Sequence, residues 1–480
     1  PGSRHGPPPQ AGTGSTAPDR LPIAGVHTMR SLFLVGALIA SLSTGVAPCA
    51  AADVIRRQQS IRSLPGQLDA VLMVNDNNPE LIKEDGILLS TFANGGDASI
   101  SVDLNGRLDL FSHHVYAGTD DTLDSTLWLA LLMAPIGDED VNLTLIEGST
   151  SLSQATQPGQ TASPFLPLPP LMRETSDVLA AGPGSRVAGD LLKGRQAPEL
   201  SQRRWTLKPG TPTVVLKLPI PVQGLDPLLN GRNLQLRLHS SAPVALATLA
   251  AHGDGHQPPD DQEWIDLLNS GELSGKEHSP TPRGSKGKII YSRVSGVQIG
   301  SRWQARITDP GSETLSIQNE PVSWPISSLE RGSLGTGQVQ TAELQALYPQ
   351  TAWAAHGNYG VEYDLTLPLQ NRGSAAQTLS LALESPLKTD QVSDALQFRS
   401  SLSGPVMFRG PVEVAGLDDT DGSPYGRQTV HLVLRQGQEG PSLGQVTLKP
   451  GEAREVQIRL IYPADATPPQ VLTVRPVKQS

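Results

Sequence analysis

The chain has 480 residues, which is long enough for two or three domains that each bury their own core. Its 37 Lys and Arg residues and 47 Asp and Glu residues give a formal net charge of -10, with no block of like charge. A nucleic-acid binder needs a basic face that displaces counterions from phosphates. The composition therefore argues against nucleic acid as a partner.

The first 52 residues carry two different patterns. Residues 1–28 are rich in Pro, Gly and polar residues without an apolar period, which predicts a disordered segment or sequence upstream of the true start. Residues 29–52 have the pattern of a secretory signal peptide. Arg30 provides the positive charge, the apolar run LFLVGALIASL follows it, and small residues lead up to Ala52. The run is too short for a lasting anchor, so we expect no transmembrane anchor after cleavage.

The only cysteine, Cys49, lies inside this predicted signal peptide. A lipoprotein is the alternative, but Pro48 directly before the cysteine fits a lipidation site poorly. After cleavage at Ala52 the chain has no cysteine and therefore no thiol nucleophile, disulfide or thiolate-bound zinc. This favours a bacterial periplasm or exterior over a eukaryotic secretory route.

The exported part of the chain is predicted to adopt an all-β fold with minor α content. The whole chain has 47 Gly and 42 Pro residues, and in the exported part they separate short runs of alternating apolar and polar residues, such as YDLTLPL at 363–369 and TVHLVLR at 429–435. Such strands bury one face, as in sandwiches and barrels. In the first of these runs, Tyr363 and Leu365 are expected to face the core and Glu362 and Asp364 the opposite side.

A repeat divides the exported chain into two halves. TLKPG occurs at 206–210 and 447–451, and a strand, a polar turn and a second strand precede each copy, at 127–149 and 363–385. The offsets are 241 residues (447 minus 206) and 236 residues (385 minus 149). This spacing predicts two β-sandwich domains of immunoglobulin-like architecture. We place the N-terminal one at 53–256 and the C-terminal one at 289–480.

Residues 257–288, between the two halves, are predicted to be a helix and a linker. Asp260 or Asp261 is expected to cap the helix at its N-terminus, and Gly271 to end it. The apolar face is formed by Trp264, Leu267 and Leu268. The Pro-, Gly- and Lys-rich residues 279–288 are expected to be mobile.

Two segments with a His-x-x-Tyr pattern are the candidate sites. They are FSHHVYAG at 111–118 and AAHGNYG at 354–360, each near the strand pair of its half. The paired occurrence favours a repeated structural corner or a binding surface over catalysis. The candidate binding residues are His113, His114, Tyr116, Trp353, His356, Asn358 and Tyr359.

Other motifs indicate structure rather than chemistry. GPGSRVAGD at 182–190 has glycines at phosphate-loop spacing but carries Asp190 where a lysine is required, so we predict a structural turn. DDTDGSPYG at 418–426 lacks the bidentate acid of a calcium loop, so we predict an exposed hairpin. No HExxH motif occurs. We predict no catalytic residue, no metal and no cofactor.

Six stretches resemble a family of exported cyanobacterial proteins known only by a domain-of-unknown-function label. They are LPGQLDAVLMVNDNNPELIKEDGILLSTF (64–92), AGPGSRVAGDLL (181–192), YSRVSGVQIGSRWQA (291–305), LGTGQVQTAEL (334–344), AWAAHGNYGVEYDLTLPLQN (352–371) and YPADATPPQVLTV (462–474). The resemblance covers nearly the whole exported chain. It implies export and a cyanobacterial source, and it implies no reaction.

These observations favour an exported protein without catalytic activity that binds or builds the bacterial cell envelope. Polysaccharide is the first partner to test, because tryptophans stack on sugar rings; those available are Trp205, Trp264, Trp303, Trp324 and Trp353. One alternative is an envelope polysaccharide hydrolase that uses an acid pair near His356, such as Glu362 and Asp364. Another is a subunit of an extracellular fibre or surface assembly, with other envelope proteins as partners.

Overall fold

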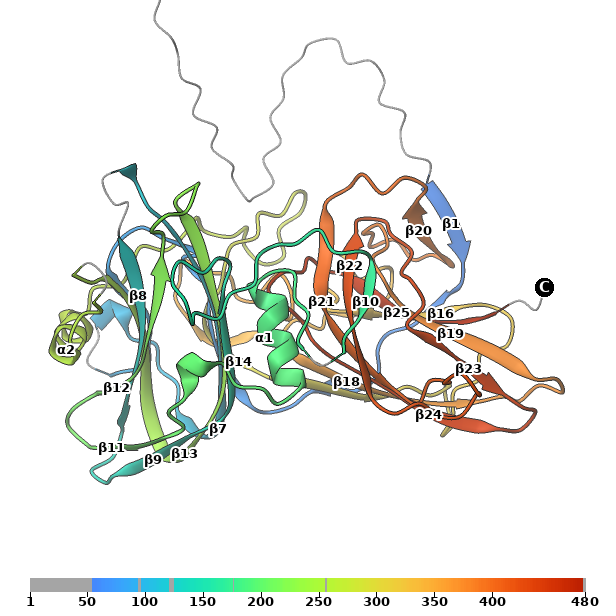
Figure 1. Ribbon diagram of the computed structural model, residues 1–480, viewed down its shortest axis with the longest axis horizontal. Helices are drawn as coiled ribbons and strands as arrows, with labels where there is room; N and C mark the ends of the chain where they lie inside the picture. Colours follow the sequence, from blue (N-terminus) through green and yellow to red (C-terminus); the bar gives the residue numbers. More distant parts are fainter. Residues whose placement is uncertain (1–53, 94–95, 121–124, 176, 255–256, 478–480) are drawn as a thin grey trace, which may run out of the picture. The chain divides into compact units, whose positions relative to one another are not determined.

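A computed structural model of the protein describes residues 54–93, 96–120, 125–175, 177–254 and 257–477 (Figure 1). Strands dominate this part of the chain, and its two α-helices are ten residues each. The prediction of an all-β fold with minor α content is therefore confirmed. The predictions for residues 1–28 and 29–52 lie outside the described residues.

The first sandwich is one sheet folded into two layers by the long strand β13 (Leu229–His252). The first part of β13 pairs with β9 (Val141–Leu152) and β7 (Leu104–Ala117), and its last part pairs with β8 (Thr126–Pro135) and β6 (Gly86–Ser90). Further members of this sheet are β4 (Leu72–Asp76), β5 (Leu81–Ile82), β11 (Arg204–Leu207), β12 (Thr213–Pro221), β14 (Ser295–Ile299) and β17 (Leu344–Leu347). Buried leucines from both layers form the core between them.

The second sandwich packs a seven-stranded sheet against a five-stranded sheet. The larger sheet runs β10 (Leu171–Arg173), β22 (Gln428–Arg435), β21 (Val406–Ala415), β24 (Ala453–Ile461), β18 (Glu362–Gln370), β15 (Arg302–Arg306) and β3 (Gln67–Leu68). The smaller runs β2 (Ser60–Ile61), β16 (Val322–Ile326), β25 (Gln470–Pro476), β19 (Gln377–Glu384) and β23 (Gly444–Leu448). Alternation places Tyr363 and Leu365 in the core between them, as predicted.

The repeated sequence pattern corresponds to a repeated strand pairing. In the first half β8 pairs with β12 and β9 pairs with β11; in the second half β18 pairs with β24 and β19 pairs with β23. The glycines of the two TLKPG copies, Gly210 and Gly451, both adopt positive φ, at 83° and 77°. The same four-strand unit thus occurs twice in the described chain.

The two halves of the sequence contribute strands to each other's sandwich. β2, β3 and β10 precede residue 256 and pair with strands of the second sandwich, while β14 and β17 follow residue 289 and belong to the first. β1 (Val54–Gln58) likewise pairs with β20 (Ala395–Arg399). The division into two domains at 257–288 and the immunoglobulin-like topology stay predictions.

The predicted helix between the halves is confirmed as α2 (Asp261–Ser270). Asp260 caps it, its side chain accepting a hydrogen bond from the Glu263 backbone N–H, and Gly271 ends it in a left-handed conformation at φ 68°. Trp264 is fully buried against the outer face of the β6 and β8 layer. A cap, an apolar face and a terminator within twelve residues were sufficient to define this element.

The predicted turn at 182–190 is wrong, because these residues begin the helix α1 (Pro183–Leu192). Proline is favoured in a first helical turn, and Gly184 lies so close to Ala464 that a β-carbon there would approach within 2.9 Å. The small residues therefore serve close packing of a helix against the second sandwich. The exposed hairpin predicted at 418–426 is confirmed between β21 and β22, where Asp418 pairs with Arg454.

Candidate functional site

The candidate residues of the first segment lie on opposite faces of β7. His113 points to the face shared with Phe111, and His114 and Tyr116 point to the other. His114 is fully buried, with Nδ1 2.8 Å from the Pro79 carbonyl and Nε2 3.2 Å from Asp76 Oδ2. Tyr116 is also buried, and its hydroxyl bonds to Ser125.

The two His-x-x-Tyr segments are not copies of one structural corner, and that prediction is wrong. His113 and Tyr116 lie within a strand, where residues three apart face opposite sides. His356 and Tyr359 lie in the loop before β18, where their rings meet edge to face at 5.3 Å. The shared spacing therefore has no common geometry.

The structure nevertheless connects the two segments through an ion pair. His113 Nε2 lies 3.5 Å from Glu80 Oε1, the other Glu80 oxygen pairs with Arg293, and Arg293 Nη1 lies 3.0 Å from His356 Nε2. Because a guanidinium only donates, His356 must accept at Nε2 and is neutral. Burial, and then the Arg293 charge, lower the pKa of His356 to about 4. Burial alone would raise the pKa of Glu80, but His113 and Arg293 lower it to about 2.

Asn358 and Tyr359 are buried beneath this connection. The Asn358 amide donates to the Gln340 carbonyl at 2.7 Å and to the Tyr363 hydroxyl at 2.9 Å, and its oxygen accepts from the Ala342 N–H at 3.1 Å. The Tyr359 hydroxyl donates to the Ala466 carbonyl at 3.0 Å. Their polar groups are satisfied within the protein, which indicates a structural role for both.

Two ring–cation pairs and the histidine beside one of them are together called the aromatic–cation surface: Arg283 with Trp353, and Lys388 with Tyr291 and His356. The Arg283 guanidinium lies 4.0 Å from the Trp353 ring centroid, and Lys388 Nζ lies 5.6 Å from that of Tyr291. The Tyr291 and His356 rings are 6.0 Å apart. Tyr291 is 40% exposed, so the group reaches solvent.

Sequence reasoning missed Glu80, Arg293 and Tyr291. Glu80 and Arg293 are 213 residues apart, and no local pattern connects them. Tyr291 follows the segment 279–288, whose composition indicated only a mobile linker. In the structure Arg331 donates to the Ser285 and Gly287 carbonyls of that segment.

The acid pair considered for hydrolysis is held by arginines. Glu362 is 3% exposed and accepts hydrogen bonds from Arg237 at 2.7 Å and Arg459 at 3.0 Å. Asp364 pairs with Arg302. Burial alone would raise the pKa of Glu362, but Arg237 and Arg459 bring it below its ordinary value. A general acid needs a raised pKa and a path to the substrate, and Glu362 has neither.

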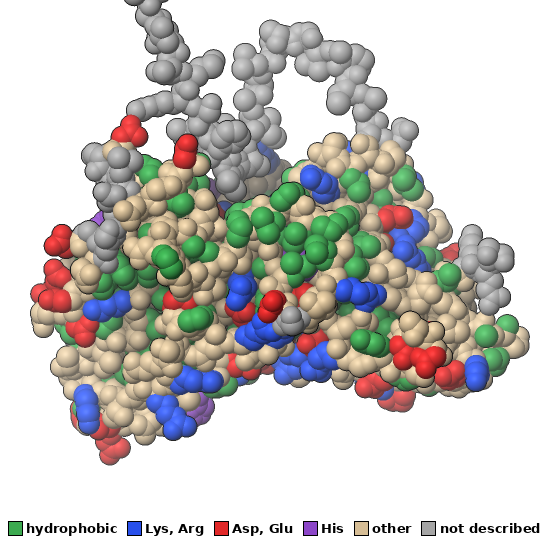
Figure 2. All heavy atoms as spheres, viewed as in Figure 1, with side chains coloured by type: hydrophobic (Ala, Val, Ile, Leu, Met, Phe, Trp, Pro, Cys, Tyr) green, Lys and Arg blue, Asp and Glu red, His purple; other side chains and the backbone are tan. Residues whose placement is uncertain are grey.

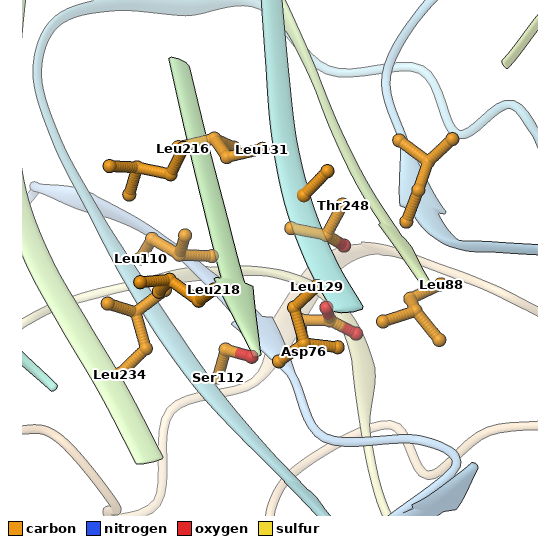
Figure 3. Close-up of a pocket in the computed structure, with 12 residues that line it drawn as sticks. Asp76, Leu88, Leu110, Ser112, Leu129, Leu131, Leu216, Leu218, Leu234 and Thr248 are labelled. Atoms are coloured by element: carbon orange, nitrogen blue, oxygen red, sulfur yellow. The ribbon is translucent and has the colours of Figure 1, made fainter. Parts of the chain in front are cut away.

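A small cavity lies inside the first sandwich (Figure 3). Its volume is about 10 Å³, which is room for about one water molecule, and leucines form most of its wall. Asp76 and Thr248 are at its polar side, where their side chains interact with each other, and Asp76 Oδ1 and Thr248 Oγ1 have no other hydrogen-bond partner among the described residues. Burial would raise the pKa of Asp76, but His114 and Lys276 lower it. This site suits a bridging water rather than a ligand.

The described residues contain no group of three or more His, Cys, Asp or Glu side chains placed to hold a metal ion. In the same part of the chain, neither helix is long and apolar enough to cross a membrane.

The fold and the site together define an all-β protein of two sandwiches with a candidate ligand surface built from aromatic and cationic side chains. The chain belongs to the family described as "Protein of unknown function (DUF3370)", whose model matches residues 59–476. This confirms the resemblance to a family with a domain-of-unknown-function label.

Two further comparisons add no function. The search among curated proteins gives no match. Among solved structures, the chain is compared with the "Crystal Structure of 11S allergen from Cocos nucifera L.", at 10% identity over 79% of this chain and 88% of that chain. The TM-score is 0.09, so this comparison carries no argument about fold or function.

Proposed function

We propose that the protein is an exported, non-catalytic binding protein of the bacterial cell envelope, and that polysaccharide binds at the aromatic–cation surface. The observations that carry the proposal are two ring–cation pairs, Trp353 with Arg283 and Tyr291 with Lys388, and the His356 ring 6.0 Å from that of Tyr291. A sugar ring has an apolar face of C–H groups and a rim of hydroxyls. Aromatic rings flanked by hydrogen-bond donors match both parts.

The cations favour an acidic polysaccharide over a neutral one. Arg283 and Lys388 are both exposed. Arg283 forms an ion pair of 2.6 Å with Glu343, and the two side chains are 58% and 59% exposed. Such an exposed pair contributes little energy and can exchange its carboxylate for that of a uronic acid. Arg283 can therefore bind a uronate without unpairing a buried charge.

The geometry of the acids supports a non-catalytic role. Glycoside hydrolysis needs two carboxylates on either side of a bound sugar, one of them protonated. Glu362 and Asp364 are instead both engaged by arginines. We therefore favour binding over the hydrolase alternative.

The test measures binding of the purified protein to an array of acidic and neutral polysaccharides. We expect binding to a uronate-containing polymer, weakened about five- to tenfold by Trp353→Ala and by Tyr291→Ala. Tyr425→Ala removes another exposed tyrosine, 48% exposed on the 418–426 hairpin, and should leave binding unchanged. Absence of binding across the array, or release of reducing ends during incubation, would overturn the proposal.

A further inference from the structure

A second candidate site is a surface groove beside the segment 163–170, which we call the proline strap. The groove has a volume of about 320 Å³ and lies between the strap and the strands β21 and β22. Figure 2 shows hydrophobic side chains gathered on this face, in the region where Figure 1 draws β10 and β21. The residues that carry the argument are Phe165, Leu166, Leu402, Val406, Arg409 and Arg435.

The walls of the groove are apolar and accessible. Phe165 is 54% exposed, Leu166 42% and Leu402 41%, which places three large hydrophobic side chains around one hollow. Single exposed hydrophobic residues are ordinary, but a contiguous group around a groove marks a binding site. An apolar ligand segment would remove this surface from water.

The strap is anchored, so the groove exists before a ligand arrives. Leu166 and Leu168 N–H groups donate to the carbonyls two residues earlier, both at 2.9 Å, and the Val433 N–H of β22 donates to the Pro170 carbonyl at 3.1 Å. Prolines at four of the eight strap positions restrict the backbone further. A preformed site costs little ordering entropy on binding.

Two cations line the groove, and no acidic residue does. The Arg409 guanidinium lies 5.3 Å from the Phe165 ring centroid, and no carboxylate of the described chain forms an ion pair with it. The Asp465 carboxylate attracts Arg409 electrostatically without forming an ion pair with it, and one of its oxygens accepts the Ser185 N–H at 2.7 Å. Arg435 donates to the Gly404 carbonyl at 2.9 Å. Arg409 and Arg435 therefore give the groove a positive charge that can attract an anion.

We propose that this groove binds an amphiphilic carboxylate, a fatty-acid anion, with the carboxylate on Arg409 and Arg435 and the hydrocarbon chain against Phe165, Leu166, Leu402 and Val406. A guanidinium matches a carboxylate through paired N–H donors. The groove volume is at the lower end of small-ligand sites, and protein partners usually need a much larger contact. The groove shares no residue with the aromatic–cation surface. A negative result at either site therefore leaves the proposal for the other site unaffected.

The test is calorimetric titration of the full chain with decanoate, below its micelle concentration. We expect saturable binding of one decanoate per chain, with 1-decanol at least about tenfold weaker because it lacks the charge. Arg409→Gln should weaken decanoate binding about tenfold or more. Leu402→Asp, at an exposed position where folding is not at risk, should weaken it similarly by placing a like charge beside the ligand.

Arg306→Gln is the matched control, because Arg306 is 50% exposed and pairs with Glu455 away from the groove. It should leave decanoate binding unchanged. No decanoate binding, equal binding of decanol, or unchanged binding in both groove variants would overturn the proposal. Binding to vesicles of anionic phospholipid without binding of free decanoate would also overturn it and would identify a membrane surface as the occupant.

Discussion

Arg237 on β13 donates a hydrogen bond of 2.7 Å to Glu362 on β18, and the two residues belong to different sandwiches. Glu362 also accepts from Arg459 on β24, and Arg459 donates to Glu413 on β21. One buried carboxylate thus binds arginines from both sandwiches. The network fixes how these two sets of strands pack, and this is a structural role for the acid that looked catalytic.

We predict that Glu362→Gln destabilises the protein. The substitution keeps the shape but removes one of the charges that compensate Arg237 and Arg459, which still pair with Glu147 and Glu413, so we expect a cost of about 3 kcal/mol, the lower end of the range for breaking a buried ion pair. The free energy of unfolding, measured by urea denaturation, should fall by about this amount. Glu455→Gln breaks an exposed pair with Arg306 and should change it by less than about 1 kcal/mol. Equal effects of the two substitutions would contradict the role of the network.

The predictable parts of this fold depended on residues close in sequence. The alternation from Glu362 to Leu369 was enough to assign the core and outer faces of β18, because a strand turns successive side chains to opposite sides. The missing information was long-range. Arg237 and Glu362 are 125 residues apart, and Glu80 and Arg293 are 213 apart, so no local spacing joins them.

The helix α1 was missed for a different reason. Gly184 and Gly189 matched a phosphate loop that lacks its lysine, so the pattern indicated a structural turn, and both glycines lower helix propensity. In the structure, nine of the ten helix residues are buried, and packing outweighs propensity. The residues of the candidate site do not all lie together, because adjacent His113 and His114 face opposite sides of the strand β7. Only the side that bears His113 connects to the second segment.

The repeated turns provide a matched prediction. Gly210 and Gly451 have positive φ and open space around the position of a β-carbon, so an alanine there meets backbone strain without a clash. Gly210→Ala and Gly451→Ala should each lower the free energy of unfolding by about 1 to 2 kcal/mol. Gly137→Ala has the same open space without a positive φ and should be neutral or slightly stabilising. Clearly unequal losses at Gly210 and Gly451 would argue against equivalent turns.

The cap of α2 is a second local prediction. Asp260 accepts from the Glu263 N–H at 2.9 Å, and the Glu263 side chain accepts from the Asp260 N–H at 2.6 Å. Asp260→Ala removes half of this reciprocal pair and should cost about 1 kcal/mol, with faster hydrogen exchange at the Trp264 amide. Asp266→Ala, on the exposed side of the same helix, should cost a few tenths of a kcal/mol at most. A larger effect at Asp266 would show that the cap is not what holds the helix.

His431 should make the protein less stable in mild acid. It is fully buried, and neither ring nitrogen has a hydrogen-bond partner among the described residues. Burial, and then the charge of Arg409, lower the pKa of His431 to about 4. Between pH 6.5 and 4 the unfolded histidine takes up a proton while the folded one stays neutral, so stability is full above pH 6.5 and is lost as the pH falls through 4.

His431→Leu should therefore change two quantities in the same denaturation series. At pH 7 the free energy of unfolding should rise by about 1 kcal/mol, because a buried polar ring without partners is replaced by an apolar side chain. Between pH 7 and 4 the loss of stability should be smaller than in the unmodified protein by roughly 2 to 3 kcal/mol. Burial raises the pKa of Asp465 to about 6, so its contribution to stability is lost as the pH rises through 6. This contribution is the same in the unmodified protein and in His431→Leu, and it cancels when their stabilities are compared. His239→Leu, at an exposed histidine, should change neither quantity by more than about 0.5 kcal/mol. If the pH dependence is the same with and without His431, the acid sensitivity of the protein arises elsewhere.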